Sequence, residues 1–183
     1  MAARAPMNDH DELVVLVDEH DRATGLSAKL DAHRLDLRHR AFSVFLFNRR
    51  GEVLLQARAR GKYHSGGLWS NACCGHPRVH EEPSAGARRR LGEEMGLDVP
   101  LTPAGRFAYR AVLDDGLYEN EIVHLFTGRS DAPPDPDPAE VAAWRWVAPA
   151  ELRQEHAADP SAFTAWFGIY LAALPGVAIG AAA

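Results

Sequence analysis

The stretch richest in reactive side chains is residues 69–77, WSNACCGHP. It places an indole, two adjacent thiols and an imidazole close together in the chain. A thiol can exchange protons when a cation lowers its pKa or when a base shares its proton, and His76 could hold such a metal cation. On its own, however, the stretch fits a glycine–proline turn with inert core cysteines equally well.

A second chemical feature is the pair of carboxylates Glu119 and Glu121. Residues two apart on a strand point to the same face. Two carboxylates there repel each other unless a metal or a shared proton relieves them. The pair in isolation is more typical of a solvated strand edge. The apolar residues that follow, in 122–126, indicate instead a strand that enters a core.

Histidine is unusually frequent, with nine residues in the chain. A lone histidine is usually a surface or structural residue. His33, His39 and His76 together with two glutamates would form a mixed nitrogen and oxygen site, which suits a first-row divalent ion such as Zn2+ or Mn2+.

Residues 75–97 carry a specific spacing of charged residues. Gly75 is followed after five residues by Glu81, and seven residues later by the run RRLGEEMGL from Arg89. This run is similar to the Nudix box, G-x5-E-x7-R-E-U-x-E-E-x-G-U, in which helix glutamates bind a divalent metal against a diphosphate. Arg90 replaces the first helical glutamate of the box. That reversal of charge disfavours a hydrolase metal cluster and suits a phosphate contact.

Together these stretches resemble type 1 isopentenyl-diphosphate delta-isomerase, a member of the Nudix superfamily. The similarity covers about residues 13–170. The matching segments are 39–43, 45–48, 68–77, 89–96, 107–111, 119–121 and 162–166.

The resemblance implies a set of site residues and two metals. The catalytic residues would be Cys74, Glu121, Tyr109 and Trp166. One further divalent ion, Mn2+ or Zn2+, would be bound by His33, His39, His76, Glu119 and Glu121. A substrate-bound Mg2+ would be held by Glu94 and by the backbone carbonyl of Cys74. The substrate diphosphate would contact Lys29, Arg58, Lys62 and Arg90, whose cations, grouped with Arg89, would share its charge with Mg2+.

The implied reaction moves the double bond of isopentenyl diphosphate to give dimethylallyl diphosphate. One of Cys74 and Glu121 would donate a proton and the other would remove one, through a tertiary carbocation. Trp166 and Trp69 are candidates to stabilise that cation through a ring face. The alternatives are a Nudix diphosphohydrolase of a nucleoside diphosphate derivative and a non-catalytic Nudix-like binding module.

The elements that must position these groups follow from the apolar pattern. Strands are predicted at residues 13–17, 41–47, 52–56, 107–112, 121–127 and 144–147, and helices at 82–94, 149–155 and 163–174. Residues 18–25 and 61–67 are predicted as turn and loop, and the segment that joins His33 to His39 as loop. Gly96 is expected to end its helix. The fold class is α/β (α+β), a Nudix-like mixed sheet packed between helices, with one domain at 11–175, a flexible arm at 1–10 and a flexible tail at 176–183.

Composition limits the partners. The net charge is −5, which gives no general attraction to nucleic acid or to an anionic membrane. No apolar run approaches the roughly 20 residues of a membrane span. The only cysteines, Cys73 and Cys74, are adjacent and poorly placed to bridge each other, which favours a reduced, cytoplasmic setting. We expect a monomer, or at most a weak dimer, that acts on a small isoprenoid diphosphate.

Overall fold

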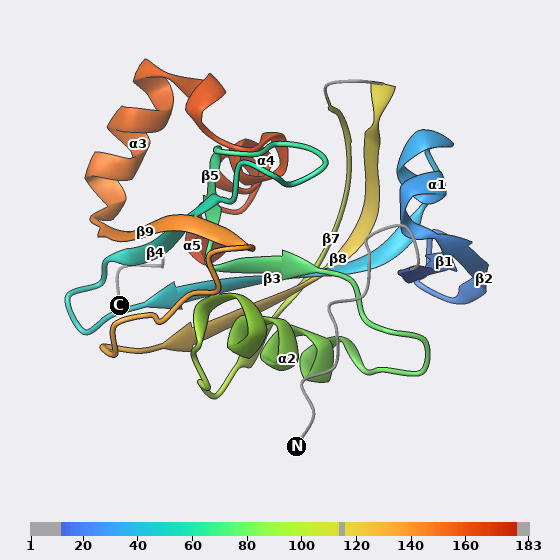
Figure 1. Ribbon diagram of the computed structural model, residues 1–183, viewed down its shortest axis with the longest axis horizontal. Coiled ribbons are helices and arrows are strands. Elements are labelled where there is room, and N and C mark those ends of the chain that lie inside the picture. The colour runs from blue at the N-terminus through green and yellow to red at the C-terminus, as the bar shows by residue number, and fades with distance from the viewer. Residues whose placement is uncertain (1–11, 114–115, 179–183) are drawn as a thin grey trace.

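The computed structural model describes residues 12–113 and 116–178. Their strands form one mixed sheet with helices on both of its faces (Figure 1). The strands are β1 (Leu13–Val17), β2 (Ala23–Ala28), β3 (His39–Phe47), β4 (Val53–Arg58), β5 (Trp69–Asn71), β6 (Cys73–Gly75), β7 (Thr102–Val112), β8 (Tyr118–Arg129) and β9 (Val141–Val147). The helices are α1 (Lys29–Arg34), α2 (Pro83–Met95), α3 (Pro149–Ala158), α4 (Ala165–Ala173) and α5 (Pro175–Ala178), with a 3-10 turn at Pro160–Ala162.

Strand β3 is the centre of the sheet. It pairs in parallel with β8 along its whole length, and antiparallel with β1, β4 and β6. Its sequence, HRAFSVFLF, is apolar at most positions, which is typical of a strand covered on both faces. The predicted α/β class with a mixed sheet between helices is therefore confirmed.

The alternation of β3 residues builds two separate cores. Phe42, Val44 and Leu46 pack with apolar residues of α2. Ala41, Phe45 and Phe47 point the other way, into a core that includes side chains of α3 and α4. Because successive residues of a strand face opposite sides, each functional side chain of the sheet is assigned to one core or the other by its position alone.

Helix α2 follows the helix signals of the sequence closely. Pro83 lies in its first turn, where a missing N–H costs little. Gly96 ends it in the left-handed conformation with φ of 65°, as expected. This helix, which carries the Nudix-like charged residues, lies on the sheet face opposite α4 (Figure 1).

The structure also corrects several predictions. Strand β2 begins inside the predicted turn at 18–25, and α1 replaces part of the predicted loop before His39, so that His33 lies on a helix. Helix α5 occupies the start of the predicted tail, and Ala178 is fully buried. The predicted arm at 1–10 and residues 179–183 lie outside the described part of the chain. Within that part, no helix is long and apolar enough to cross a membrane.

Candidate active site

A cavity of about 610 Å³ is lined by residues of both α2 and α4 and by strands of the sheet. Its lining includes all four predicted catalytic side chains, Cys74, Tyr109, Glu121 and Trp166. It also includes all four predicted diphosphate contacts, Lys29, Arg58, Lys62 and Arg90. Residues from seven elements and one loop therefore converge on one space, as the sequence hypothesis requires.

The register of the sheet explains how the thiol and the carboxylate come to line one cavity. Cys74 of β6 pairs with Ser43 of β3, and Glu121 of β8 pairs with His39 of the same strand. Ser43 and His39 are four residues apart and so lie on the same face of β3. The two candidate acid/base groups thus reach the cavity from strands on opposite sides of β3.

The two cysteines have separate surroundings. Cys73 is fully buried in the α2 core, whereas Cys74 packs on the cavity side, and both are free thiols. The Cys74 thiol donates to Asn71 Oδ1 at 3.1 Å and lies 3.3 Å from Ser43 Oγ, which contacts Tyr170 Oη at 3.0 Å. Burial raises the pKa of the Cys74 thiol to about 12, against the opposing effect of Ser43. This thiol therefore holds its proton at neutral pH.

Glu121 lies at the centre of the histidine cluster. Its Oε1 is 3.1 Å from His76 Nε2 and 3.4 Å from His39 Nε2. Its Oε2 accepts a hydrogen bond of 2.7 Å from the Tyr109 hydroxyl, because the two residues face each other across β7 and β8. Burial acts to raise the pKa of Glu121, but its close contacts with His39 and His76 hold it well below its usual value.

Glu119 is the neighbouring carboxylate on the same face of β8. Its Oε2 is 3.3 Å from His33 Nε2. Burial, followed by the negative charge of Glu121, raises the pKa of Glu119. The two carboxylates share one buried site, and the nearby positive groups do not balance both negative charges. Glu119 therefore has the higher proton affinity and Glu121 the lower.

The histidine rings are oriented by contacts outside the cluster. The Nδ1 atoms of His33 and His39 donate to the carbonyl oxygens of Lys29 and Leu37, at 2.7 and 2.8 Å. Each Nε2 then faces the carboxylates, where a neutral ring would offer its lone pair to a cation. This is the usual arrangement of metal-binding histidines, whose second nitrogen is fixed by an outer partner.

The donor set fits a divalent cation. Potential ligand atoms of His33, His39, His76 and Glu121 all lie within 4.8 Å of one another. Among the described residues, His39 Nε2, His76 Nδ1 and Glu119 Oε2 are buried without a hydrogen-bond partner. Burial lowers the pKa of His76 to about 4, although its contact with Glu121 acts in the opposite direction, so that the ring is neutral. Neutral imidazoles and carboxylates are the ligands that zinc and manganese accept.

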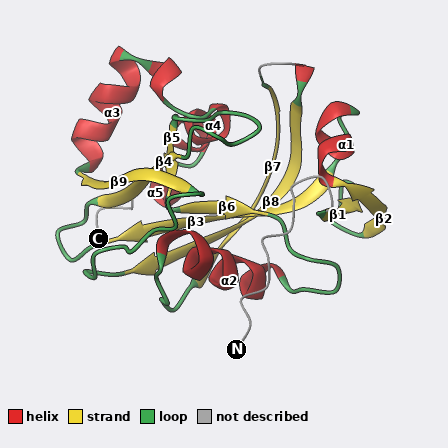
Figure 2. Cartoon of the chain, viewed as in Figure 1, coloured by secondary structure: helices red, strands yellow, loops and turns green. Residues whose placement is uncertain are grey.

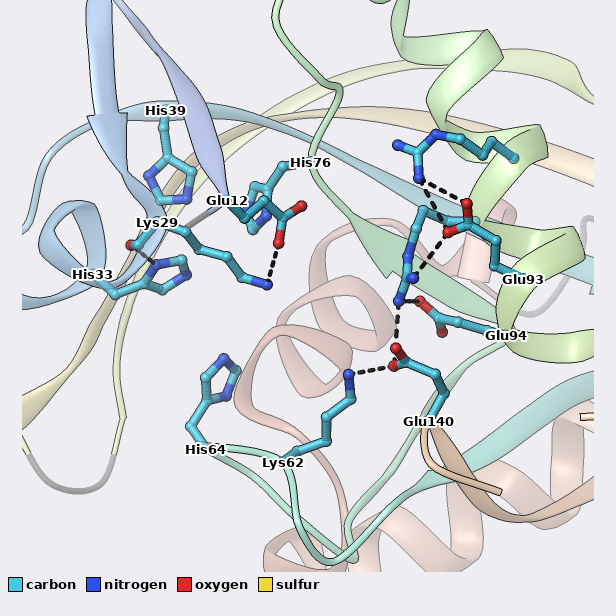
Figure 3. A network of polar contacts seen from close by, with 12 residues as sticks. Glu12, Lys29, His33, His39, Lys62, His64, His76, Glu93, Glu94 and Glu140 are labelled. Carbon is cyan, nitrogen blue, oxygen red and sulfur yellow. Dashed lines mark hydrogen bonds and ion pairs between the residues drawn. The ribbon is translucent and has the colours of Figure 1, made fainter. Parts of the chain in front are cut away.

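A second polar cluster occupies the opposite end of the cavity (Figure 3). Arg90 donates to Glu94 at 2.7 Å and lies 3.2 Å from Glu140, which also pairs with Lys62. Glu94 additionally accepts a hydrogen bond of 3.0 Å from Gln56. Carboxylates therefore neutralise the cations that the sequence assigns to a diphosphate.

The remaining two predicted diphosphate contacts are also engaged. Lys29 pairs with Glu12 at 2.8 Å (Figure 3). Arg58 lies 5.4 Å from the ring of Trp166, whose Nε1 donates to Ser70 Oγ at 2.9 Å. Both cations line the cavity and stay within reach of a ligand there.

Two residues grouped with the site on sequence grounds lie elsewhere. Arg89 does not line this cavity, because its guanidinium group forms two hydrogen bonds to Glu81, of 2.8 and 2.9 Å. Trp69 is likewise absent from the lining, and the guanidinium of Arg145 lies 4.4 Å from its ring. The suggestion that Trp69 stabilises a cation in the cavity is therefore wrong.

Several residues that line the cavity or bond to its lining were not singled out by the sequence. Asn71 and Ser43 lie in recognisable segments, and Gln56 is a polar residue inside an apolar strand, which is a usable signal. Tyr170 and His64 carry no such signal. Contacts to the site are made by Ser43, Gln56, His64, Asn71 and Tyr170.

Comparison with known proteins gives a consistent result. The family model of the NUDIX domain matches residues 37–167. A Burkholderia multivorans protein named isopentenyl-diphosphate Delta-isomerase is 52% identical over 157 residues, which are 86% of this chain and 89% of that protein. A protein of the same name from Streptomyces coelicolor is 50% identical over 169 residues, covering 90% and 85% of the two chains.

Solved structures support the fold. A Deinococcus radiodurans crystal structure matches with a TM-score of 0.70 at 22% identity, covering 81% of this chain and 90% of that one. A MutT protein from Methanosarcina mazei matches with a TM-score of 0.60 at 20% identity, covering 74% and 91%. At these identities the likeness concerns the fold alone.

Proposed function

This chain belongs to the isopentenyl-diphosphate Delta-isomerases of the NUDIX family, and we propose on that premise that it converts isopentenyl diphosphate to dimethylallyl diphosphate. The observation that carries the proposal is the position of Cys74 and Glu121, which line one cavity from opposite sides of β3. A hydrolase does not need this pair.

The chemistry follows from an unactivated alkene. Moving its double bond requires a proton to be added at one carbon and another to be removed elsewhere. Cys74 retains its proton at neutral pH and Glu121 is ionised, so the resting pair offers one acid and one base. One member of the pair donates and the other removes a proton, and Tyr109 orients the Glu121 carboxylate.

The intermediate in this proposal is a tertiary carbocation, which must be kept from water. Trp166 is buried and lines the cavity, where its ring face can stabilise a cation by ~1–2 kcal/mol. The diphosphate would contact Lys29, Arg58, Lys62 and Arg90, of which Lys62 and Arg90 lie at the end of the cavity opposite the histidine cluster. Binding at a distance from the reacting carbons fixes the five-carbon chain between acid and base.

Two divalent cations complete the proposal. An Mn2+ or Zn2+ ion on His33, His39, His76, Glu119 and Glu121 would offset the charge of the two carboxylates and change the proton affinity of Glu121. Mg2+ would accompany the diphosphate, with Glu94 and the Cys74 carbonyl as its protein ligands. Compartment and assembly stay as the sequence predicts them: a cytoplasmic monomer, or at most a weak dimer.

The alternative, a Nudix diphosphohydrolase, has less support. The relatives compared above carry the isomerase name. In addition, Arg90 stands where the Nudix box has a glutamate, and its guanidinium group is paired with Glu94 and Glu140. A cation at that position competes with metal for the very carboxylate that a hydrolase would use.

The test is turnover of isopentenyl diphosphate with Mg2+ in deuterated water, followed by NMR. We expect Cys74→Ala and Glu121→Gln each to reduce kcat by roughly a thousandfold or more, because each removes a proton-transfer group. Cys73→Ala is the matched control, since the neighbouring thiol faces the α2 core, and it should retain turnover. Near-normal turnover by either active-site variant would remove the proposed pair.

A further inference from the structure

His64 is a cavity residue to which the proposed reaction assigns no role. It lies in the loop between β4 and β5, which extends from α4 toward the β7–β8 hairpin (Figure 2). Its side chain is only 7% exposed, and its Nε2 is 3.7 Å from Glu119 Oε1. Figure 3 shows the imidazole directed from the loop toward Lys29 and His33.

His64 belongs to a second group of potential ligand atoms, made of His33, His64 and Glu119, which lie within 4.8 Å of one another. This group shares His33 with the cluster around Glu121, so the two groups adjoin. Glu119 Oε2, which is buried without a hydrogen-bond partner among the described residues, belongs to the same carboxylate that His64 faces. A buried acceptor in that state is a group that a bound cation would satisfy.

The distances suit a common cation. Two ligand atoms that are each about 2.1 Å from one ion lie roughly 3.0–3.6 Å apart when they subtend about 90–120°. His33 Nε2 lies 3.3 Å from Glu119 Oε2 and His64 Nε2 lies 3.7 Å from Glu119 Oε1, so the two imidazoles face different oxygens of one carboxylate. A shift of a few tenths of an ångström in the loop would bring His64 within that range.

The ring of His64 is held as the other histidines are. Its Nδ1 lies 3.2 Å from the Ser65 hydroxyl, so that Nε2 is the nitrogen that faces the carboxylate. The ring also meets the edge of Tyr63 at 4.3 Å and that of Trp166 at 5.7 Å between centroids. Ser65 adopts a positive φ of 52°, which is costly for a residue other than glycine and is retained where the surroundings require it.

We propose that His64 is an additional protein ligand of the divalent cation at the His33–Glu119 side of the site, so that binding of the cation fixes the loop at residues 61–67 over the cavity. The same loop carries Lys62, and the His64 carbonyl accepts a hydrogen bond of 3.4 Å from Arg58. Cation binding would therefore also position two of the proposed diphosphate contacts. This inference rests on the proposed function, because it adds a ligand to the cation site proposed there.

The experiment measures cation binding rather than turnover. Metal-free wild type, His64→Ala and the control His20→Ala are titrated with Co2+, and the affinity and the visible absorption bands of the bound ion are recorded. His20 is an exposed histidine with a 64% accessible side chain. We expect His64→Ala to weaken binding by about tenfold or more and to change the absorption bands, and His20→Ala to match wild type.

A second measurement follows the loop itself. Trypsin cleavage at Arg60 and Lys62 is timed with and without Co2+. We expect the cation to slow cleavage of wild type and to leave that of His64→Ala unchanged. If His64→Ala does not fold, X-ray absorption of Zn2+-loaded wild type decides the question, with four imidazole ligands expected and three contradicting the proposal.

The outcomes separate the two proposals. An unchanged affinity and spectrum in folded His64→Ala would overturn the role of His64 and leave the isomerase site intact. A wild-type protein that binds no divalent cation would overturn this inference together with the metal site. Failure of the isomerase itself is recognised separately, by absence of turnover in wild type.

Discussion

At the scale of single residues, the Tyr109 hydroxyl is the most specific contact of the candidate base. It donates to Glu121 at 2.7 Å from a fully paired position on β7. Tyr109→Phe removes this bond and leaves a buried carboxylate oxygen without its donor, which costs about 1–3 kcal/mol. We expect kcat to decrease by roughly ten- to a hundredfold with KM little changed. Steady-state kinetics and thermal unfolding check this. A tenfold or larger increase in KM with kcat unchanged would instead indicate a role in substrate binding.

The thiol allows a prediction in pH. Because the pKa of Cys74 is raised to about 12, its thiolate fraction at pH 8 is about a thousandfold below that of an ordinary cysteine with a pKa of about 8.5. Alkylation by iodoacetamide should therefore be slow and should still increase with pH between 8 and 10. Mass spectrometry of the modified peptide measures the rate. A rate that levels off by pH 9 would show that the pKa is not raised.

The raised pKa of Cys74 also determines how this thiol changes the free energy of unfolding with pH. The unfolded thiol ionises near pH 9, whereas the folded thiol does not until about pH 12. Above pH 9 the unfolded state therefore binds fewer protons than the folded state, and stability contributed by this group decreases as pH rises.

Residue roles were predictable where several groups lie in one short segment. Cys74 and His76 are two residues apart, as are Glu119 and Glu121, and strand alternation alone aligns the carboxylates. The role of His64 could not be predicted in this way. His64 and Glu119 are 55 residues apart in the chain, and their contact depends on the conformation of an irregular loop.

At the scale of elements, α2 contains two glycines with opposite requirements. A Cβ on Gly86 would lie 2.9 Å from Phe42 Cε1, 2.9 Å from Glu81 Oε2 and 3.3 Å from the Pro77 Cα. A Cβ on Gly92 would meet only the Leu97 carbonyl oxygen, at 3.8 Å. Alanine stabilises a helix by about 0.8–1 kcal/mol relative to glycine, so the outcome depends on whether that gain is opposed by a clash.

We therefore expect Gly92→Ala to increase the free energy of unfolding by up to about 1 kcal/mol and Gly86→Ala to decrease it by about 1–3 kcal/mol. Urea denaturation of both variants measures the difference. Equal effects would show that α2 does not pack as closely on β3 as the structure has it.

Elements were predictable where apolar runs are long or helix signals are explicit. The strand at residues 41–47 and the helix ended by Gly96 are confirmed, each with small changes in its bounds. Strand β2, ATGLSA, was not predicted because it is mostly exposed and pairs only at the edge of the sheet with β1. This segment is a strand because it pairs with β1, and such pairing cannot be predicted from the local pattern of hydrophobic residues.

At the scale of the whole molecule, we expect the histidine cluster to couple folding to cation binding. A cation at 100 times its dissociation constant stabilises a folded protein by ~2.7 kcal/mol, which raises the Tm of a chain of this size by roughly 5–10 °C. We expect Mn2+ or Zn2+ to produce such a shift in metal-free protein. His39→Ala should show a much smaller shift. Thermal unfolding measures both, and no shift with either cation would contradict the proposed site.

Acid should act on the metal-free protein through the same cluster. The pKa of His76 is lowered to about 4, below the ordinary value of 6.5 that it takes when unfolded. Between pH 6.5 and 4 the unfolded state binds more protons, and this contribution to stability is lost as pH falls.

The convergence of the site could not be derived from the sequence alone. Parallel pairing of β3 with β8 places His39 beside Glu121, and nothing in either segment specifies that partner. The family resemblance indicated that these residues form one site. The register of the sheet explains physically how they come together.

The carboxylates that pair with Lys62 and Arg90 have a consequence for ligand selection. Glu94 and Glu140 pair with these two cations, so their positive charge is already compensated by carboxylates of the protein. An incoming anion must therefore displace the carboxylates of Glu94 and Glu140 from these cations. Once displaced, Glu94 needs another cation to balance its charge. A ligand that arrives with its own magnesium ion meets both demands at once, whereas a bare monoanion meets neither, so the resting pairs act as a filter against singly charged metabolites.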